Sequence, residues 1–252
     1  MDKKQRPIAV FDSGVGGISV LKELVRQMPG ERFLYYGDSA NAPYGTRPTG
    51  QIRELTLQAA QMLMDRGIKA LVVACNTATA AAIADLRRQY PDAIIVGIEP
   101  ALKLAYDHFP HSRVGVLATP ATLREEKFHN LAERFPDLQV TPIALPGLVE
   151  LIETGSEDSE MEAFLAPILT PYRGKLDAVV LGCTHYPFAA HVIGKLLGPD
   201  TAILDGSAGT AQQTRRRLEE ADLLENGEGQ VQLESSDPDP RLLRRCAQLL
   251  ER

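Results

Sequence analysis

Two cysteines in matching contexts, Cys75 and Cys183, are the residues of this 252-residue chain best suited to acid–base or nucleophilic chemistry. Each follows a short apolar run, at 71–73 and 178–181, and precedes small polar residues and a predicted helix. A thiol at a strand end and before a helix start lies near backbone N–H groups and the helix dipole, which favour a thiolate. One such cysteine alone is more simply a small buried side chain, but two copies indicate a repeated functional device.

The remaining cysteine, Cys246, lies in the leucine-rich segment LLRRCAQLL and is predicted to pack in a core. Three cysteines cannot all pair, and neither Cys75 nor Cys183 has a CxxC partner or a nearby Cys/His cluster at zinc-site spacing. We therefore expect neither a metal site nor a disulfide framework.

Two polar loops follow the first two predicted strands. The first, DSGVGG from Asp12 onward, resembles a phosphate loop weakly, because it lacks the Lys-Ser/Thr of a P-loop and because the Asp12 carboxylate would repel a phosphate. Capping of the next helix is the alternative for Asp12, as it is for Thr119 and Thr122 farther along. The second loop, at 38–45, is either a connector or a ligand-binding loop, since ligands bind at strand carboxyl ends in open α/β sheets.

Composition indicates an ordinary globular protein, with 44% hydrophobic and 24% charged residues and a net charge of −6. The short basic clusters at 215–217 and 244–245 fall on predicted helix faces, so we expect no nucleic-acid partner. No apolar stretch approaches membrane-spanning length, and the amino terminus enters a strand without a signal-like apolar region. These features predict a cytoplasmic protein that does not contact membranes.

Strands and helices alternate along the chain, which predicts an α/β fold with mainly parallel sheets covered on both faces. Strands are expected at 7–11, 32–37, 71–73, 94–98, 112–118, 138–143, 178–181 and 202–204, and helices include 49–66, 119–134 and 212–224. The βα series restarts near residue 98, which predicts two similar doubly wound domains, with the active site in the cleft between them. We expect residues 1–97 and 208–252 in the first domain and 98–207 in the second.

Six segments resemble, in this order, a known enzyme family: FDSGVGGISVL, YYGDSANAPYGTR, VVACNTATAAA, LVELIETG, LGCTHYPF and an approximate DGSAGTA. They are similar to segments of the glutamate racemases, cofactor-independent members of the aspartate/glutamate racemase superfamily. Racemisation without a cofactor requires one base to remove the α-proton while an acid on the opposite face returns one, which a thiolate and a thiol can do. The resemblance thus explains why two cysteines are present.

The resemblance implies that Cys75 removes the α-proton of D-glutamate and Cys183 that of L-glutamate, with Asp12 assisting the former and His185 and Glu153 the latter. It implies substrate contacts from Asp12 and His185 and also from Ser13, Tyr44, Gly45, Asn76, Thr77, Thr119, Thr122 and Thr184. It further implies a homodimer without a cofactor, supplying D-glutamate for peptidoglycan and so for cell-wall biogenesis and cell shape. Whether Asp12 accepts a proton or orients the substrate ammonium stays open.

Three other functions compete with this one. An aspartate or hydantoin racemase of the same superfamily is disfavoured by the DSGVGG and CTHYP segments, which are of the glutamate type. A binding protein for a small dicarboxylate, with two inert cysteines, and a thiol redox protein are the rivals from other classes.

Overall fold

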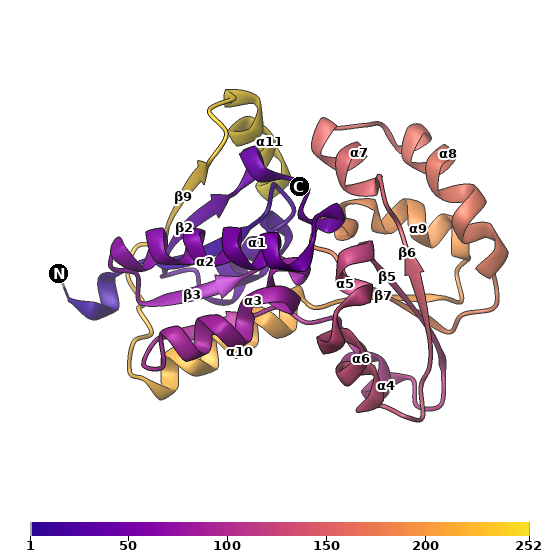
Figure 1. The fold of residues 1–252 in the computed structure, drawn as a ribbon, viewed down its shortest axis with the longest axis horizontal. Coiled ribbons are helices and arrows are strands. Elements are labelled where there is room, and N and C mark those ends of the chain that lie inside the picture. The colour runs from indigo at the N-terminus through magenta and orange to yellow at the C-terminus, as the bar shows by residue number, and fades with distance from the viewer. Residues whose placement is uncertain (1, 252) are drawn as a thin grey trace.

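The computed structural model describes residues 2–251 and contains two separate parallel β-sheets (Figure 1). The first sheet has the strand order β4-β3-β1-β2-β9, and the second has the order β6-β5-β7-β8. All adjacent strands in both sheets run parallel. The predicted fold class, two doubly wound α/β units, is confirmed.

The strands coincide closely with the apolar runs of the sequence. The first sheet comprises β1 (Ile8–Asp12), β2 (Arg32–Gly37), β3 (Ala70–Val73), β4 (Ile94–Gly97) and β9 (Gln230–Ser235). The second comprises β5 (Arg113–Ala118), β6 (Gln139–Ala144), β7 (Ala178–Leu181) and β8 (Ala202–Asp205). Every residue of β1, β3 and β7 is buried, as expected for central strands covered by helices on both faces.

Helices connect the strands and cover the sheets. They are α1 (Ile18–Gln27), α2 (Thr49–Asp65), α3 (Asn76–Gln89), α4 (Leu102–His108), α5 (Pro120–Arg124), α6 (Glu126–Glu133), α7 (Leu148–Thr154), α8 (Asp158–Leu169), α9 (Ala190–Leu197), α10 (Ser207–Glu220) and α11 (Pro240–Glu251). Among the described residues, we find no helix with the length and apolar character needed to cross a bilayer.

The end of the chain returns to the first sheet. Strand β9 pairs with β2 (Figure 1). Helices α10 and α11 both pack against α1. The intervening chain, from α4 to β8, forms the second sheet and its helices. The boundaries 1–97 with 208–252 and 98–207 stay a prediction.

Two helix predictions were wrong. The segment predicted as one helix, 119–134, is divided into α5 and α6 because Glu125 between them has an extended backbone, with φ −72° and ψ 136°. The Thr49 hydroxyl donates to the Glu125 carboxylate at this break. Helix α10 begins at Ser207, five residues before the predicted start at 212, and the Asp205 carboxylate accepts a hydrogen bond from the Ser207 N–H at 2.7 Å.

Candidate active site

The two predicted catalytic cysteines lie at the carboxyl ends of central strands in different sheets, Cys75 after β3 and Cys183 after β7. Hydrogen bonds join these two edges: the Thr184 hydroxyl donates to Asp12 at 3.0 Å, and the Ser19 hydroxyl donates to the Thr184 carbonyl at 2.9 Å. Residues far apart in the chain therefore meet at one site between the sheets.

Cys75 is a buried thiol at the start of a long helix. It is the N-cap residue of α3, and its sulfur accepts a hydrogen bond from the Ala78 N–H at 3.4 Å. The Ser13 hydroxyl lies 3.5 Å from the same sulfur. Burial, followed by the negative charge of Asp12, raises the pKa of Cys75 to about 12, although both hydrogen bonds act against this shift. The resting side chain is therefore a neutral thiol at neutral pH.

Cys183 has a different set of partners. Its sulfur lies 3.8 Å from Nδ1 of His185, whose Nε2 lies 2.9 Å from a Glu153 carboxylate oxygen. Burial disfavours the charged imidazole, but the hydrogen bonds with Cys183 and Glu153 outweigh it and hold the pKa of His185 well above its ordinary value. Burial likewise disfavours the Glu153 carboxylate, yet the His185 bond lowers the pKa of Glu153. Cys183, His185 and Glu153 thus form a hydrogen-bonded series in which the imidazole can hold a proton between the thiol and the carboxylate.

Asp12 ends β1, the strand next to β3, and is fully buried. Its carboxylate accepts hydrogen bonds from the Gly14 N–H and the Thr184 hydroxyl, both at 3.0 Å. Burial raises the pKa of Asp12, although the charge of His185 and these hydrogen bonds act in the opposite direction. The buried Asp12 carboxylate could therefore stabilise a positively charged group placed beside it.

The glycines after Asp12 are explained by close packing. A Cβ at Gly14 would overlap the Glu153 carboxylate, and a Cβ at Gly16 would overlap the His185 imidazole. The loop thus lets side chains from the second sheet approach the end of β1. This packing, which depends on residues far along the chain, replaces the phosphate-loop interpretation.

Neutral polar groups gather at the start of α3. The Thr77, Thr119 and Thr122 hydroxyls lie 3.0 Å from one another, and all three side chains are buried. Both polar atoms of the buried Asn76 amide lack a hydrogen-bond partner within residues 2–251. Burying an amide without hydrogen bonds costs free energy. The Asn76 amide is therefore a candidate for hydrogen bonds to a ligand.

The predicted contacts Tyr44 and Gly45 lie on the loop after β2. Tyr44 donates from its hydroxyl to Asp38 at 2.6 Å, and the Asn41 amide donates to both Asp38 oxygens at 3.1 Å. Gly45 faces Thr119 of the other half so closely that a Cβ would lie 2.8 Å from it. Asp38, which the sequence reasoning did not single out, organises this loop; its place directly after a strand was the available signal.

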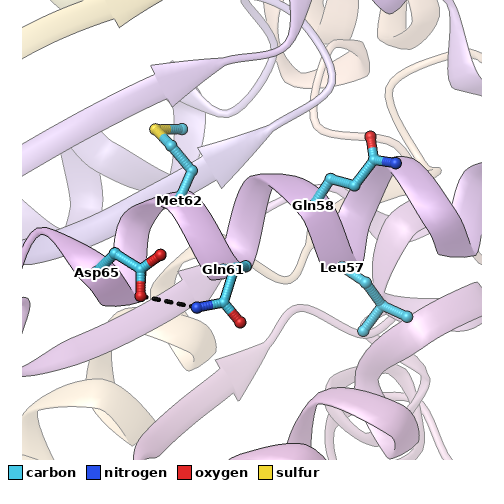
Figure 2. Close-up of a pocket in the computed structure, with 5 residues that line it drawn as sticks. All are labelled: Leu57, Gln58, Gln61, Met62 and Asp65. Atoms are coloured by element: carbon cyan, nitrogen blue, oxygen red, sulfur yellow. Dashed lines mark hydrogen bonds between the residues drawn. The ribbon is translucent and has the colours of Figure 1, made fainter.

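One surface hollow lies away from these residues. It has a volume of about 570 Å³ and lies along α2, lined by Leu57, Gln58, Gln61, Met62 and Asp65 (Figure 2). Its residues offer neither a thiol nor an imidazole, and the Gln61 amide already donates to Asp65 at 2.7 Å. We also find no group of three or more His, Cys, Asp or Glu side chains arranged for a metal within residues 2–251.

Comparison with known proteins gives consistent matches over the chain. The sequence profile of the Asp/Glu/Hydantoin racemase family matches residues 10–214. The glutamate racemase of Clostridium kluyveri is 52% identical over 221 residues, covering 86% of each chain, and that of Clostridium acetobutylicum is 46% identical over 256 residues, covering all of each. The crystal structure of Thermus thermophilus glutamate racemase in complex with β-chloro-D-alanine superimposes with a TM-score of 0.85 at 39% identity, covering 99% of this chain and 94% of that one.

Proposed function

The chain belongs to the Asp/Glu/hydantoin racemase family, and from this premise we propose that it is a glutamate racemase, interconverting L- and D-glutamate by two-base proton transfer. The family resemblance seen in the sequence motifs is thereby confirmed. The observation that carries the proposal is the pair of buried thiols at strand ends of two different sheets, each with its own polar partners. Such a pair can address both faces of a carbon bound between them.

We propose that Cys75 removes the α-proton of D-glutamate and Cys183 that of L-glutamate. In each direction one cysteine acts as thiolate base, and the opposite thiol then protonates the carbanion on its other face. After turnover the two thiols have exchanged their protonation states. Neither step requires a cofactor.

His185 and Glu153 support the Cys183 side in this proposal. An imidazole with a raised pKa can take the proton of the neighbouring thiol and so leave a thiolate ready to act as base. Glu153, at 2.9 Å from the other ring nitrogen, stabilises the resulting imidazolium and fixes the ring.

Asp12 supports the other side by orienting the substrate ammonium. Burial raises the pKa of its carboxyl group, and a bound substrate ammonium would supply a cation that stabilises the carboxylate. The Ser13 hydroxyl, 3.5 Å from Cys75, completes this side.

The substrate carboxylates bind to neutral donors. The unpaired Asn76 amide and the buried threonine hydroxyls at the start of α3 suit an anion, because the helix dipole also favours negative charge there. The remaining contacts come from Tyr44, Gly45, Thr184 and His185. We further propose a cytoplasmic homodimer that supplies D-glutamate for peptidoglycan.

The test is racemisation by purified, chelator-treated protein in deuterated water. We expect circular dichroism of either glutamate enantiomer to decay to zero and deuterium to enter the α-carbon. Aspartate, one methylene shorter, should be a poor substrate, by about a hundredfold in kcat/KM, because it misplaces the reacting carbon. Absence of α-deuterium would favour the dicarboxylate-binding or thiol redox protein, and equal use of aspartate would favour an aspartate racemase.

A further inference from the structure

A hydrogen bond from the C-terminal helix reaches the helix that carries Glu153. Arg245 on α11 donates from Nη2 to the carbonyl oxygen of Ile152 on α7, at 3.0 Å. Helix α11 belongs to the first core through the buried Cys246 and Leu249, whereas Ile152 is in a core of the second sheet. The bond therefore connects the two halves of the molecule one residue before Glu153.

Helix α7 depends on such outside support. It has seven residues and lies between two glycines with left-handed backbone, Gly147 at φ 101° and Gly155 at φ 80°. A helix this short is marginal without tertiary contacts. Arg245 places a cationic donor at its carboxyl end, where a positive charge is favoured and where the Gly155 N–H also bonds to Ile152.

We propose that Arg245 is a positioning residue for the Cys183 side: it holds the end of α7 so that Glu153 stays within hydrogen-bond distance of His185. The inference rests on the proposed racemase function. Glu153 has His185 at 2.9 Å and the Val15 N–H at 3.4 Å as its partners, so a small shift of α7 alters the contact with the imidazole. In this proposal Arg245 acts through Glu153, because its hydrogen bond ends on the carbonyl of the preceding residue, Ile152.

The matched pair of variants is Arg245→Met and Arg244→Met. Methionine keeps the apolar stem of arginine and removes the guanidinium, and Arg244 is an exposed neighbour on the same helix. We expect kcat to fall about tenfold for Arg245→Met and to stay unchanged for Arg244→Met, since misplacement by a fraction of an ångström has effects of this order. Arg245→Lys, which retains charge and a donor, should recover part of the loss.

Two readouts separate positioning from general destabilisation. In a Glu153→Gln background, Arg245→Met should lower kcat by less than twofold, because the effects of two substitutions that act through the same contact are not additive. The isotope effect on kcat/KM should rise with L-[2-²H]glutamate and fall toward one with D-[2-²H]glutamate, because proton transfer at Cys183 becomes the slower step.

An additive double variant, unchanged isotope effects or an equal loss in Arg244→Met would overturn the positioning role, whereas a wild-type protein that fails to racemise glutamate would overturn the proposed function instead. If circular dichroism shows that Arg245→Met is unfolded, Arg245→Lys takes its place in the double-mutant cycle with Glu153→Gln.

Discussion

The two thiols of this site occupy similar places in two similar sheets, yet their surroundings differ. Cys75 caps α3 and has a hydroxyl and a backbone N–H as partners. Cys183 is instead followed by a turn through Thr184 and His185 and by a short 3-10 helix, Tyr186–Ala189, before α9 begins. This turn brings the His185 imidazole back to the Cys183 sulfur.

This difference teaches that two faces of one reaction need not be built alike. Mirror-image substrates have equal energies in water, so kcat/KM must be the same in both directions whatever the residues on each side. The asymmetry can appear in the separate kcat and KM values of the two enantiomers and in which proton transfer is slower, and isotope effects report the latter. A thiol kept neutral by burial and a thiol paired with an imidazole are therefore both compatible with the racemase proposed here.

The largest expected effect comes from removing either thiol. Cys75→Ser and Cys183→Ser should each lower the racemisation rate by about a thousandfold or more, because a serine hydroxyl is far too weakly acidic to replace the acid–base group on its face. Glutamate binding, measured by calorimetry, should be largely retained. Cys246→Ser, which replaces a buried cysteine of α11, should keep full activity.

The same variants test whether one chain holds a complete site. Mixing Cys75→Ser with Cys183→Ser, under conditions that exchange subunits, should leave the sample inactive, since each chain still lacks one thiol. Recovered activity in a sample shown to contain mixed oligomers would mean that the site is shared between chains.

A smaller effect is expected from crowding the imidazole. In Gly16→Ala the new Cβ would displace the His185 ring, which loosens its contact with Cys183. We expect kcat to fall about a hundredfold, with the isotope effect rising for L-[2-²H]glutamate and falling for the D-enantiomer. This pattern of isotope effects would show that the substitution slows proton transfer at Cys183.

The control is Gly50→Ala on α2, where a Cβ would meet no described atom within 4 Å. It should leave activity unchanged and stabilise the protein by up to about 1 kcal/mol, because alanine is the better helix former. Equal activity of Gly16→Ala and wild type would contradict the role given to His185.

The sequence predicted the strands and the two thiols because both are local signals: a run of buried-strand residues and a cysteine at its end. Strand β2 was predicted at its observed bounds, 32–37. The family resemblance, confirmed by the relatives, added the other site residues, and their roles stay predictions.

What the sequence could not predict depends on distant partners. The glycines at 14 and 16 resembled a weak phosphate loop, because the neighbouring sequence does not indicate that Glu153 and His185 pack against them. The unpaired amide of Asn76 and the link from Arg245 to Ile152 are likewise visible only after both halves have folded. Long-range packing, rather than local propensity, decides these features.

The smallest expected effect concerns the Cys75 side and appears as a pH dependence of stability. The pKa of Cys75 is raised by burial and by Asp12 to about 12, from 9.0 for an unperturbed thiol. Above about pH 9 the unfolded chain loses this proton while the folded protein keeps it, so the free energy of unfolding falls as pH rises. The slope approaches about 1.4 kcal/mol per pH unit. Between about pH 9 and pH 10, wild type should thus lose about 1 kcal/mol more than Cys75→Ser in urea unfolding, whereas parallel curves would show that Cys75 ionises normally in the folded protein and that the contrast between the two thiols is smaller than their surroundings suggest.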